Sequence, residues 1–525
     1  MDARKCRIIL LAILGLALIV RLYHLASPVA DSLQVKQNFT ANKARCIAGP
    51  PFDPLRNSFD FLDEAGHRTA LSEEIPLFST VLAAGYRMFG EQDWIGHALS
   101  LIGTLVALLA LFDLVHREAN DEIALMATAL MAASPLLIFY GRAVMPDSWM
   151  LAGMLGSAAF YRRYLDEIKS RWLILAAIAG LNAATFKYFG LMVVIPLAEM
   201  TWRAFGSWKA LFSRRFLGLL AIMISPIMLW MAFVFFKTPN PVESGWVEGH
   251  VYPYFVFQSP KILLSKTLYA AFFERFLVKD CGPMLAGLIA IGIAMARKVG
   301  RSQASPIHFL RGWSLMGLGF FFLLGPKLRD HDYYELMMLP AAAIWGALGL
   351  QALAKRSEAV GFHPQKFAVM VVASAFVVQS PWVMGGLFRL DEGKLLLAKK
   401  LRDSCPPEGR IVAIGPGIEF PTIVHYSHRE GWPIHRPLLP ENWREKMDRY
   451  RAEGAKFVAV YFEPKATSEQ KASYQPMIES LPILEHYQGS ITRLGGPCEF
   501  FILSLEEKSM PRNTKIAKQA GNQKR

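Results

Sequence analysis

Charged and polar side chains flank or interrupt long apolar runs at a few places, where a charge next to lipid is costly and usually functional. These residues are Asp31, Glu74, Arg142, Asp147 and Lys187, followed by Lys327, Arg329, His331, Asp332, Tyr333 and Tyr334. A carboxylate at such a place can take up a proton, and a lone lysine should reach the interface or meet an anion. The run 325–334 holds two cations, two carboxylates, a histidine and two tyrosines, which favours a functional segment.

Several of these residues also have an ordinary structural explanation. Asp31 fits a helix N-cap or a solvated loop charge. Glu74 fits the first turn of an amphipathic helix that lies in the membrane interface. Asp147 fits a helix cap behind Pro146, and Lys187 fits a side chain that extends to the interface. A functional interpretation therefore depends on the elements that bring these residues to one membrane face.

The composition predicts that most of these elements lie in lipid. Hydrophobic residues make up 53% of the 525 residues and charged residues 19%, against about 25% charged in an ordinary globular chain. The net charge of +14 would suggest a nucleic-acid partner in a soluble protein. In a membrane protein, basic cytoplasmic loops explain the same charge, so we expect membrane lipids and no nucleic acid as partners.

Apolar runs predict about eleven transmembrane helices. They lie at residues 8–20, 95–115, 123–140, 148–164, 172–185, 191–202, 216–236, 284–296, 309–324, 336–353 and 367–388. The first run fits a retained signal anchor, with a cleaved signal peptide as the alternative. Basic residues gather in the loops that are cytoplasmic if the N-terminus is inside, as the positive-inside rule requires. An odd number of spans then leaves everything after Arg389 outside.

The predicted fold is an α-helical polytopic membrane protein with a small C-terminal α/β extracytoplasmic domain. We expect a transmembrane module over residues 1–389, which includes a first outer loop with interfacial helices at 26–93. Residues 390–505 should form the α/β domain, because 411–414, 457–462 and 500–503 look like buried strands. Residues 506–525 are polar and basic and should be disordered.

Cysteine placement leaves one pairing open. Cys405 precedes the first predicted tail strand and Cys498 precedes the last. The two sulfurs would approach disulfide distance if those strands were neighbours in one sheet. Two reduced cysteines near strand ends are the alternative.

Taken in order, these segments resemble the GT-C glycosyltransferases, in the protein-mannosyltransferase and lipid A aminoarabinosyltransferase branch. The resemblance covers roughly residues 7–349 and is weaker in the tail. The matching segments are Asp31 after the first span, Glu74-Ile75-Pro76-Leu77-Phe78, Met145-Pro146-Asp147, Phe186-Lys187-Tyr188 and His331-Asp332-Tyr333-Tyr334. Residues 424–432 resemble a tail motif of many bacterial relatives. Ser32 stands where mannosyltransferase relatives often have a second acid, which leaves acceptor recognition open.

The resemblance implies inverting transfer of a sugar from a polyprenyl-phosphate donor to a hydroxyl of a lipid, glycan or protein acceptor. Asp31 would be the base, while Asp147 and Glu74 would orient the acceptor or hold a divalent metal. The cations and phenols would stabilise the departing lipid phosphate; they are Lys187, Lys327, Arg329, Tyr333 and Tyr334. His331, Asp332 and Arg142 are further site candidates.

The expected location is a bacterial inner membrane, with the site and the tail domain on the periplasmic side. The competing hypothesis is a multi-pass transporter or lipid flippase, although the halves show no repeat and the charges gather at one face. A structural scaffold is the third class. The sequence leaves the sugar, the acceptor, the metal dependence and the oligomeric state undetermined.

Overall fold

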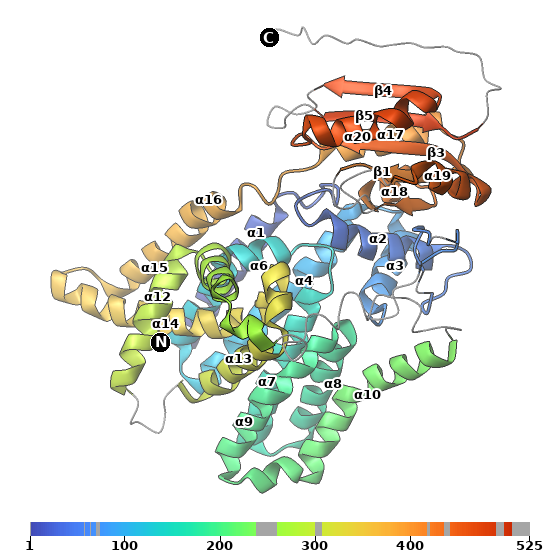
Figure 1. Ribbon diagram of the computed structural model, residues 1–525. Coiled ribbons are helices and arrows are strands. Elements are labelled where there is room, and N and C mark those ends of the chain that lie inside the picture. Colours follow the sequence, from blue (N-terminus) through green and yellow to red (C-terminus); the bar gives the residue numbers. More distant parts are fainter. Residues whose placement is uncertain are drawn as a thin grey trace. The chain divides into compact units, whose positions relative to one another are not determined.

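The computed structural model is mostly helical, with one five-stranded sheet near the C-terminus (Figure 1). The structure describes residues 2–56, 58–63, 65–69, 74–237, 260–299, 307–416, 421–434, 441–489 and 498–506. The chain divides into two compact units. The helical unit comprises residues 1–26, 72–78 and 94–388, and the sheet unit comprises residues 27–71, 79–93 and 389–525. The predicted basic tail from 507 onward lies outside the described residues.

Helices account for all the regular structure described before residue 410. The α-helices are α1 (Ala3–Leu22), α2 (Gln34–Ala48), α3 (Leu77–Phe89), α4 (Asp93–Glu118), α5 (Asp121–Ala133), α6 (Pro135–Tyr140), α7 (Asp147–Glu167), α8 (Ser170–Phe186), α9 (Val194–Phe205), α10 (Arg214–Lys237), α11 (Lys266–Ala271), α12 (Pro283–Val299), α13 (Ile307–Asp330), α14 (Leu339–Ser357), α15 (Pro364–Ser374), α16 (Ser380–Met384) and α17 (Glu392–Ser404). Shorter 3-10 or π-helical segments are η1 (Tyr188–Val193), η2 (Trp208–Phe212), η6 (Pro260–Leu264), η7 (Phe272–Asp280), η8 (Asp332–Met337), η9 (Glu358–Val360) and η10 (Ala375–Gln379).

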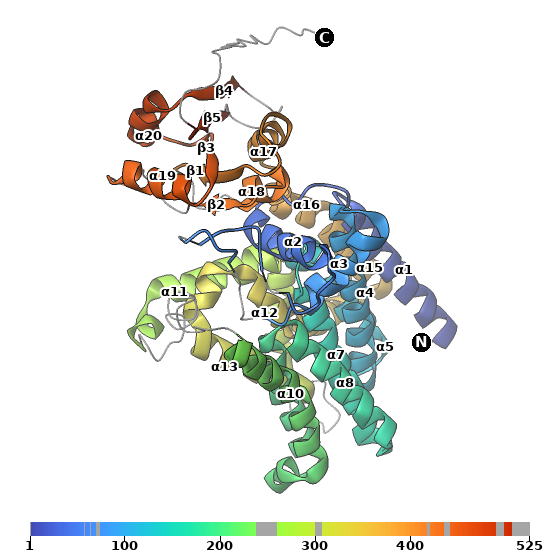
Figure 2. The ribbon, with the colours of Figure 1, turned by 90° about the vertical axis from the view of Figure 1, so that its right-hand side faces the viewer.

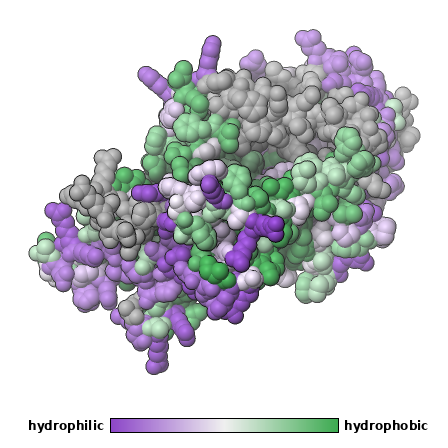
Figure 3. All heavy atoms as spheres, turned by 90° about the horizontal axis from the view of Figure 1, so that it is seen from below, coloured by the Kyte–Doolittle hydropathy of each residue, from purple (hydrophilic) through white to green (hydrophobic). Residues whose placement is uncertain are grey.

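Each apolar run that predicted a membrane span falls on one or more of these helices. Three described helical segments are long and apolar enough to cross a membrane by themselves, at Asp93–Glu118, Arg214–Phe236 and Pro364–Met384. A fourth candidate is a pair bent by 110°, at Lys266–Asp280 and Pro283–Met295. Large apolar side chains are exposed on several helices, as Figure 3 shows in green for one face, and such surface suits contact with lipid. The fold class is confirmed, while the count of about eleven spans stays a prediction.

The sheet unit is built on five strands in the order β2-β1-β3-β5-β4. The strands are β1 (Arg410–Ile414), β2 (Gly431–Pro433), β3 (Ala455–Phe462), β4 (Ile483–Gly489) and β5 (Cys498–Ser504). β1 pairs in parallel with β2 and β3, whereas β5 pairs antiparallel with β3 and β4. The three predicted strands correspond to β1, β3 and β5. The short β2 and the largely exposed β4 were not predicted, because neither has a buried apolar run.

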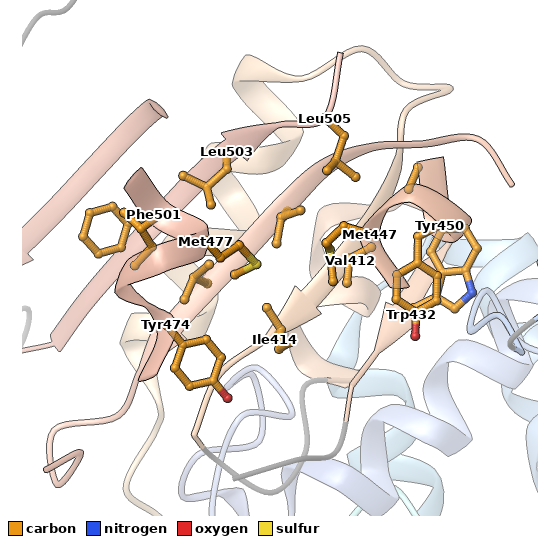
Figure 4. Packing of buried hydrophobic residues seen from close by; sticks show 14 of the residues in the cluster. Val412, Ile414, Trp432, Met447, Tyr450, Tyr474, Met477, Phe501, Leu503 and Leu505 are labelled. Atoms are coloured by element: carbon orange, nitrogen blue, oxygen red, sulfur yellow. The ribbon is translucent and has the colours of Figure 1, made fainter. Parts of the chain in front are cut away.

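Four helices cover the two faces of this sheet, with α17 and α18 (Pro421–Ser427) on one and α19 (Trp443–Ala452) and α20 (Ser468–Ser480) on the other (Figure 2). Strand residues alternate between the faces, so Phe457 and Ala459 join the first core while Val458 and Val460 join the second. In Figure 4 the side chains of α19 and α20 point toward those of β1 and β5 across the second core. The result is a three-layer α/β/α arrangement.

Part of the first outer loop belongs to the sheet unit, whereas the sequence analysis assigned that loop to the transmembrane module. Phe59 and Phe61 are buried in the first core, with Phe39 packed against it. Phe61 also forms a parallel bridge with Gly431 of β2. The sequence did not predict this assignment, because the aromatic side chains are buried against a sheet whose strands come some 350 residues later in the chain.

The two tail cysteines are free thiols buried in the first core. A disulfide between them required β1 and β5 to be neighbouring strands. This condition is not met, because β3 lies between the two strands. Burial is the main cause that raises the pKa of each thiol, Cys405 and Cys498, to about 11. Both thiols therefore remain protonated, and unreactive as nucleophiles, near neutral pH.

We predict that Leu397→Ala loosens the sheet unit, because Leu397 of α17 is completely buried in the first core. A cavity at such a site costs about 2–5 kcal/mol. Hydrogen exchange followed by mass spectrometry should show peptides of β3 exchanging about 30-fold faster or more. The control is Leu484→Ala, since Leu484 on β4 is 46% exposed. Equal exchange in both variants would contradict the assignment of α17 to this core.

Candidate active site

A tight pair of helices, α7 and α8, creates the central feature of the helical unit. A side chain added at Gly153 would lie 2.7 Å from the backbone N of Ala183, so only glycine allows the two helices to approach this closely. Two residues, Ile168 and Lys169, connect the helices, which therefore run antiparallel. The start of α7 and the end of α8 consequently meet at one end of the pair.

Asp147 and Lys187 stand at this shared end. Asp147 is the first residue of α7, and Lys187 is the residue that ends α8. Lys187 Nζ donates a hydrogen bond to Asp147 Oδ1 over 2.7 Å, and the side chains are 3% and 1% exposed. Asp147 is not the N-cap of α7, because Pro146 occupies that position. Lys187 is buried and meets an anion, the Asp147 carboxylate, which was one of the two outcomes expected for it.

One carboxylate oxygen of this pair has no hydrogen-bond partner among the described residues. Asp147 Oδ2 is buried and accepts no hydrogen bond from the part of the chain that the structure describes. Buried polar atoms in folded proteins are almost always satisfied, so an exception calls for an explanation such as a ligand. The arrangement offers an acceptor for a hydroxyl of a bound molecule.

Two tyrosines of η8 complete the surroundings of Lys187. Its ammonium lies 4.6 Å from the ring centroid of Tyr333 and 4.4 Å from that of Tyr334, within cation–π range. The two rings are 4.6 Å apart, and the ring of His331 packs against both. The structure therefore brings together three segments that the sequence analysis selected independently.

Glu74 contributes charge to the same place. Burial is the main cause that raises the pKa of Tyr334 well above 10, and nearby Tyr333, Glu74 and Asp147 add to the effect. The phenol therefore stays protonated and remains a hydrogen-bond donor. The sequence predicted Glu74 in the first turn of an amphipathic helix. That helix, α3, begins only at Leu77, so Glu74 precedes it.

A second set of polar contacts involves Asp332 and Glu335 of η8. Of the residues in this set, the sequence predicted only Asp332 as a site candidate. Asp332 accepts a hydrogen bond from the Tyr140 hydroxyl over 2.5 Å. Glu335 is completely buried and accepts from Arg275 over 2.6 Å. Glu335 directly follows the two tyrosines in the chain, so its position was a usable signal. No sequence signal pointed to Arg275, because only folding brings η7 next to η8.

Lys327 and Arg329 lie on α13, which continues to Asp330, so the helix extends beyond the span predicted to end at residue 324. A helix packed through its earlier turns can continue past Pro326 despite the missing backbone N–H. The side chains of residues 326–330 lie outside the described part, and their predicted role stays a prediction.

Arg142 is buried among other residues of the helical unit. Its guanidinium lies 4.5 Å from the ring centroid of Phe388 and donates to the backbone oxygen of His24 over 3.2 Å. Its own backbone oxygen bonds to His97 Nδ1 over 2.8 Å. These contacts give Arg142 a role in packing α1, α4 and the segment before α7.

Asp31 belongs to the sheet unit and is 3% exposed. Its Oδ1 accepts from the backbone N of Leu33 over 3.1 Å and from Gln37 Nε2 over 2.7 Å. The side chain does not cap α2, whose N-cap residue is Leu33. Two donors on one oxygen fix the orientation of the carboxylate. Gln37 is the partner that the sequence analysis overlooked.

A divalent metal was one role open to Asp147 and Glu74. Across the described residues, no three His, Cys, Asp or Glu side chains lie close enough together to hold a metal ion.

Comparisons with known proteins agree with this fold. The family model described as dolichyl-phosphate-mannose-protein mannosyltransferase matches residues 73–233, which include Glu74, Asp147 and Lys187. No curated protein matches the chain significantly.

Solved structures similar to the chain include ArnT from Cupriavidus metallidurans bound to undecaprenyl phosphate, with a TM-score of 0.62, 13% identity and coverage of 94% of this chain and 97% of that one. Another is the archaeal oligosaccharyltransferase AglB from Archaeoglobus fulgidus in complex with an inhibitory peptide and a dolichol-phosphate, with a TM-score of 0.55, 14% identity and coverage of 96% and 75%. The arabinofuranosyltransferase AftD from Mycobacteria has a TM-score of 0.55 at 14% identity, covering 97% of this chain and 40% of that one. The resemblance predicted from the sequence is thereby confirmed.

We predict that Lys187→Met destabilises the helical unit, because it leaves the Asp147 carboxylate buried and unpaired. Breaking a buried ion pair costs about 3–5 kcal/mol, whereas replacing both partners costs far less. Thermal unfolding in detergent should therefore show a large drop for Lys187→Met, and a much smaller one when Asp147→Asn is added. If the single variant melted at the parent temperature, the pair would not be buried as described.

Proposed function

We propose that this chain, which has the GT-C fold of membrane glycosyltransferases, transfers a sugar with inversion from a polyprenyl-phosphate donor to an acceptor hydroxyl. The family match and the fold support a glycosyltransferase that is an integral membrane protein. The ArnT and AglB structures contain undecaprenyl phosphate and dolichol-phosphate, which supports a lipid phosphate as the leaving group.

The observation that carries the proposal is the buried pair of Asp147 and Lys187 under the Tyr333 and Tyr334 rings. An ammonium group has three N–H donors, and the bond to Asp147 uses one of them. The remaining donors and a protonated phenol are suited to a lipid phosphate as negative charge develops on it. Asp147 Oδ2, which is buried and has no donor in the described part of the chain, is suited to accept from a sugar or acceptor hydroxyl.

The incoming hydroxyl must lose its proton as it attacks, and we assign the role of base to Asp31. Its carboxylate is buried and held by Leu33 and Gln37, so it is pre-oriented rather than free to rotate. The assignment comes from the resemblance of the first loop to the family. Asp147 and Glu74 would then orient the reactants, with Lys327 and Arg329 as further phosphate ligands.

The basic residues of the predicted cytoplasmic loops support an active site on the outer face of the membrane. In a bacterium this membrane would be the inner one, and the site would face the periplasm. A lipid-linked donor would reach the site sideways from the bilayer, which suits residues at helix ends.

Asp31→Asn should abolish transfer, because an amide cannot accept the proton of the attacking hydroxyl. The assay uses membranes that contain the variant and two labelled donors, undecaprenyl-phosphate mannose and undecaprenyl-phosphate aminoarabinose. We expect a loss of about 10²-fold or more in turnover with normal membrane insertion. The control is Asp53→Asn, since Asp53 lies in the same loop and also accepts from the backbone N two residues later. Near-parental turnover by Asp31→Asn would remove Asp31 from the mechanism.

Lys327→Ala should weaken the use of the donor more than that of the acceptor, because a lost cation affects the phosphate. Donor titrations at saturating acceptor should show the donor KM raised about tenfold, equivalent to roughly 1.4 kcal/mol. Lys355→Ala is the matched control, since Lys355 is an exposed residue in the last turn of α14. An unchanged donor KM would show that Lys327 does not bind the phosphate.

A further inference from the structure

The chain just before Asp31 is tied to the C-terminal part of the sheet unit by backbone hydrogen bonds. The backbone N of Val29 donates to the Tyr426 hydroxyl over 2.7 Å. The backbone N of Asp391 donates to the carbonyl of Ala30 over 2.7 Å. Val29 and Ala30 are both completely buried, so these bonds are not exchanged with water. The backbone that leads into Asp31 is therefore fixed from outside the first loop.

Helix α2, which supplies Gln37 to the Asp31 carboxylate, is held by the same part of the chain. Asn38 Nδ2 donates to the Val29 carbonyl over 2.8 Å and to Thr422 Oγ1 over 3.0 Å. The Thr422 hydroxyl in turn donates to Gln34 Oε1 over 2.8 Å. Thr422 and Tyr426 lie one turn apart on α18, so they face the same side.

The Tyr426 hydroxyl uses both of its hydrogen-bonding capacities. It accepts from Val29 and donates to Asp93 Oδ2 over 2.8 Å. Burial is the main cause that raises the pKa of Tyr426 well above 10, and the Asp93 carboxylate adds to it, so the phenol stays protonated and can donate. Removing the hydroxyl would leave a buried N–H and a carboxylate oxygen without this partner.

We propose that α18, through Tyr426 and Thr422, is a positioning element that holds the Asp31 carboxylate in its working orientation. The inference rests on the proposed role of Asp31 as the base. It gives the C-terminal domain a task in catalysis without any contact between α18 and the substrate. Tyr426 and Thr422 are thus positioning residues, and their loss should affect turnover and not substrate binding.

The test uses the full-length enzyme in detergent, with the labelled donor that the parent turns over. Tyr426→Phe and Thr422→Val should each lower kcat about 10–100-fold, because small misplacements of a catalytic group have effects of this size. Donor and acceptor KM should stay within about twofold, since binding is untouched. Thr422→Ser keeps the hydroxyl and should retain the parent kcat. Tyr487→Phe removes a half-buried phenol from β4 and serves as the control.

Hydrogen exchange gives a readout that does not depend on activity. In Tyr426→Phe, peptides that cover residues 27–38 should exchange faster, while peptides of β3 stay as in the parent. In the Asp31→Asn background, Tyr426→Phe should cause no further loss of turnover, because there is no base left to position. A further loss in that background would indicate a general structural effect and would overturn the proposal.

The two proposals fail in different ways. If Asp31→Asn is inactive but Tyr426→Phe and Thr422→Val keep the parent kcat, the positioning role is wrong and the proposed function stands. If the parent turns over neither donor, the proposed function is wrong, and unchanged exchange over residues 27–38 would then overturn the positioning role as well.

Discussion

The start of α7 and the end of α8 keep a carboxylate and an ammonium group together out of water. Each ion alone would cost several kcal/mol to bury, so neither can be buried without the other. Asp147 and Lys187 meet only because Gly153 allows α7 and α8 to pack closely along their length. Among the described residues the pair leaves one carboxylate oxygen without a partner, and it places a cation against two aromatic rings. These groups are the ones that could bind a ligand.

Much of this was predictable from the sequence because it depends on local signals. Apolar runs mark helices whatever their neighbours, and the order of Asp147, Lys187 and Tyr333 along the chain matched a known pattern of segments. Residues such as Arg275 and Gln37 were not predictable, because their importance comes from partners far away or on another turn. The apolar run 457–462 indicated a buried strand, but the order of strands that separates Cys405 from Cys498 depends on long-range pairing.

The polar character of α2 illustrates the same limit. Its sequence, Gln34–Ala48, resembles that of a solvent-exposed helix, yet Gln37, Asn38 and Asn42 are completely buried. Burial is tolerated because each amide is hydrogen-bonded, Gln37 to Asp31, Asn38 to Val29 and Asn42 to Asp60. A polar helix whose buried amides donate hydrogen bonds has no apolar stripe to reveal it, and these bonds suit a support for the carboxylate that we propose as the base.

The composition of the sheet unit has a consequence for how the protein is made. Residues 27–71 emerge early in synthesis, but the strands and helices that bury Phe59 and Phe61 are made only after residue 389. During insertion of the intervening helices, this early segment must wait without its core, exposing aromatic side chains that favour misfolding or capture by chaperones. A segment synthesised late therefore completes the folding of one synthesised early, and a chain that ends before residue 389 lacks the strands that order the loop around Asp31.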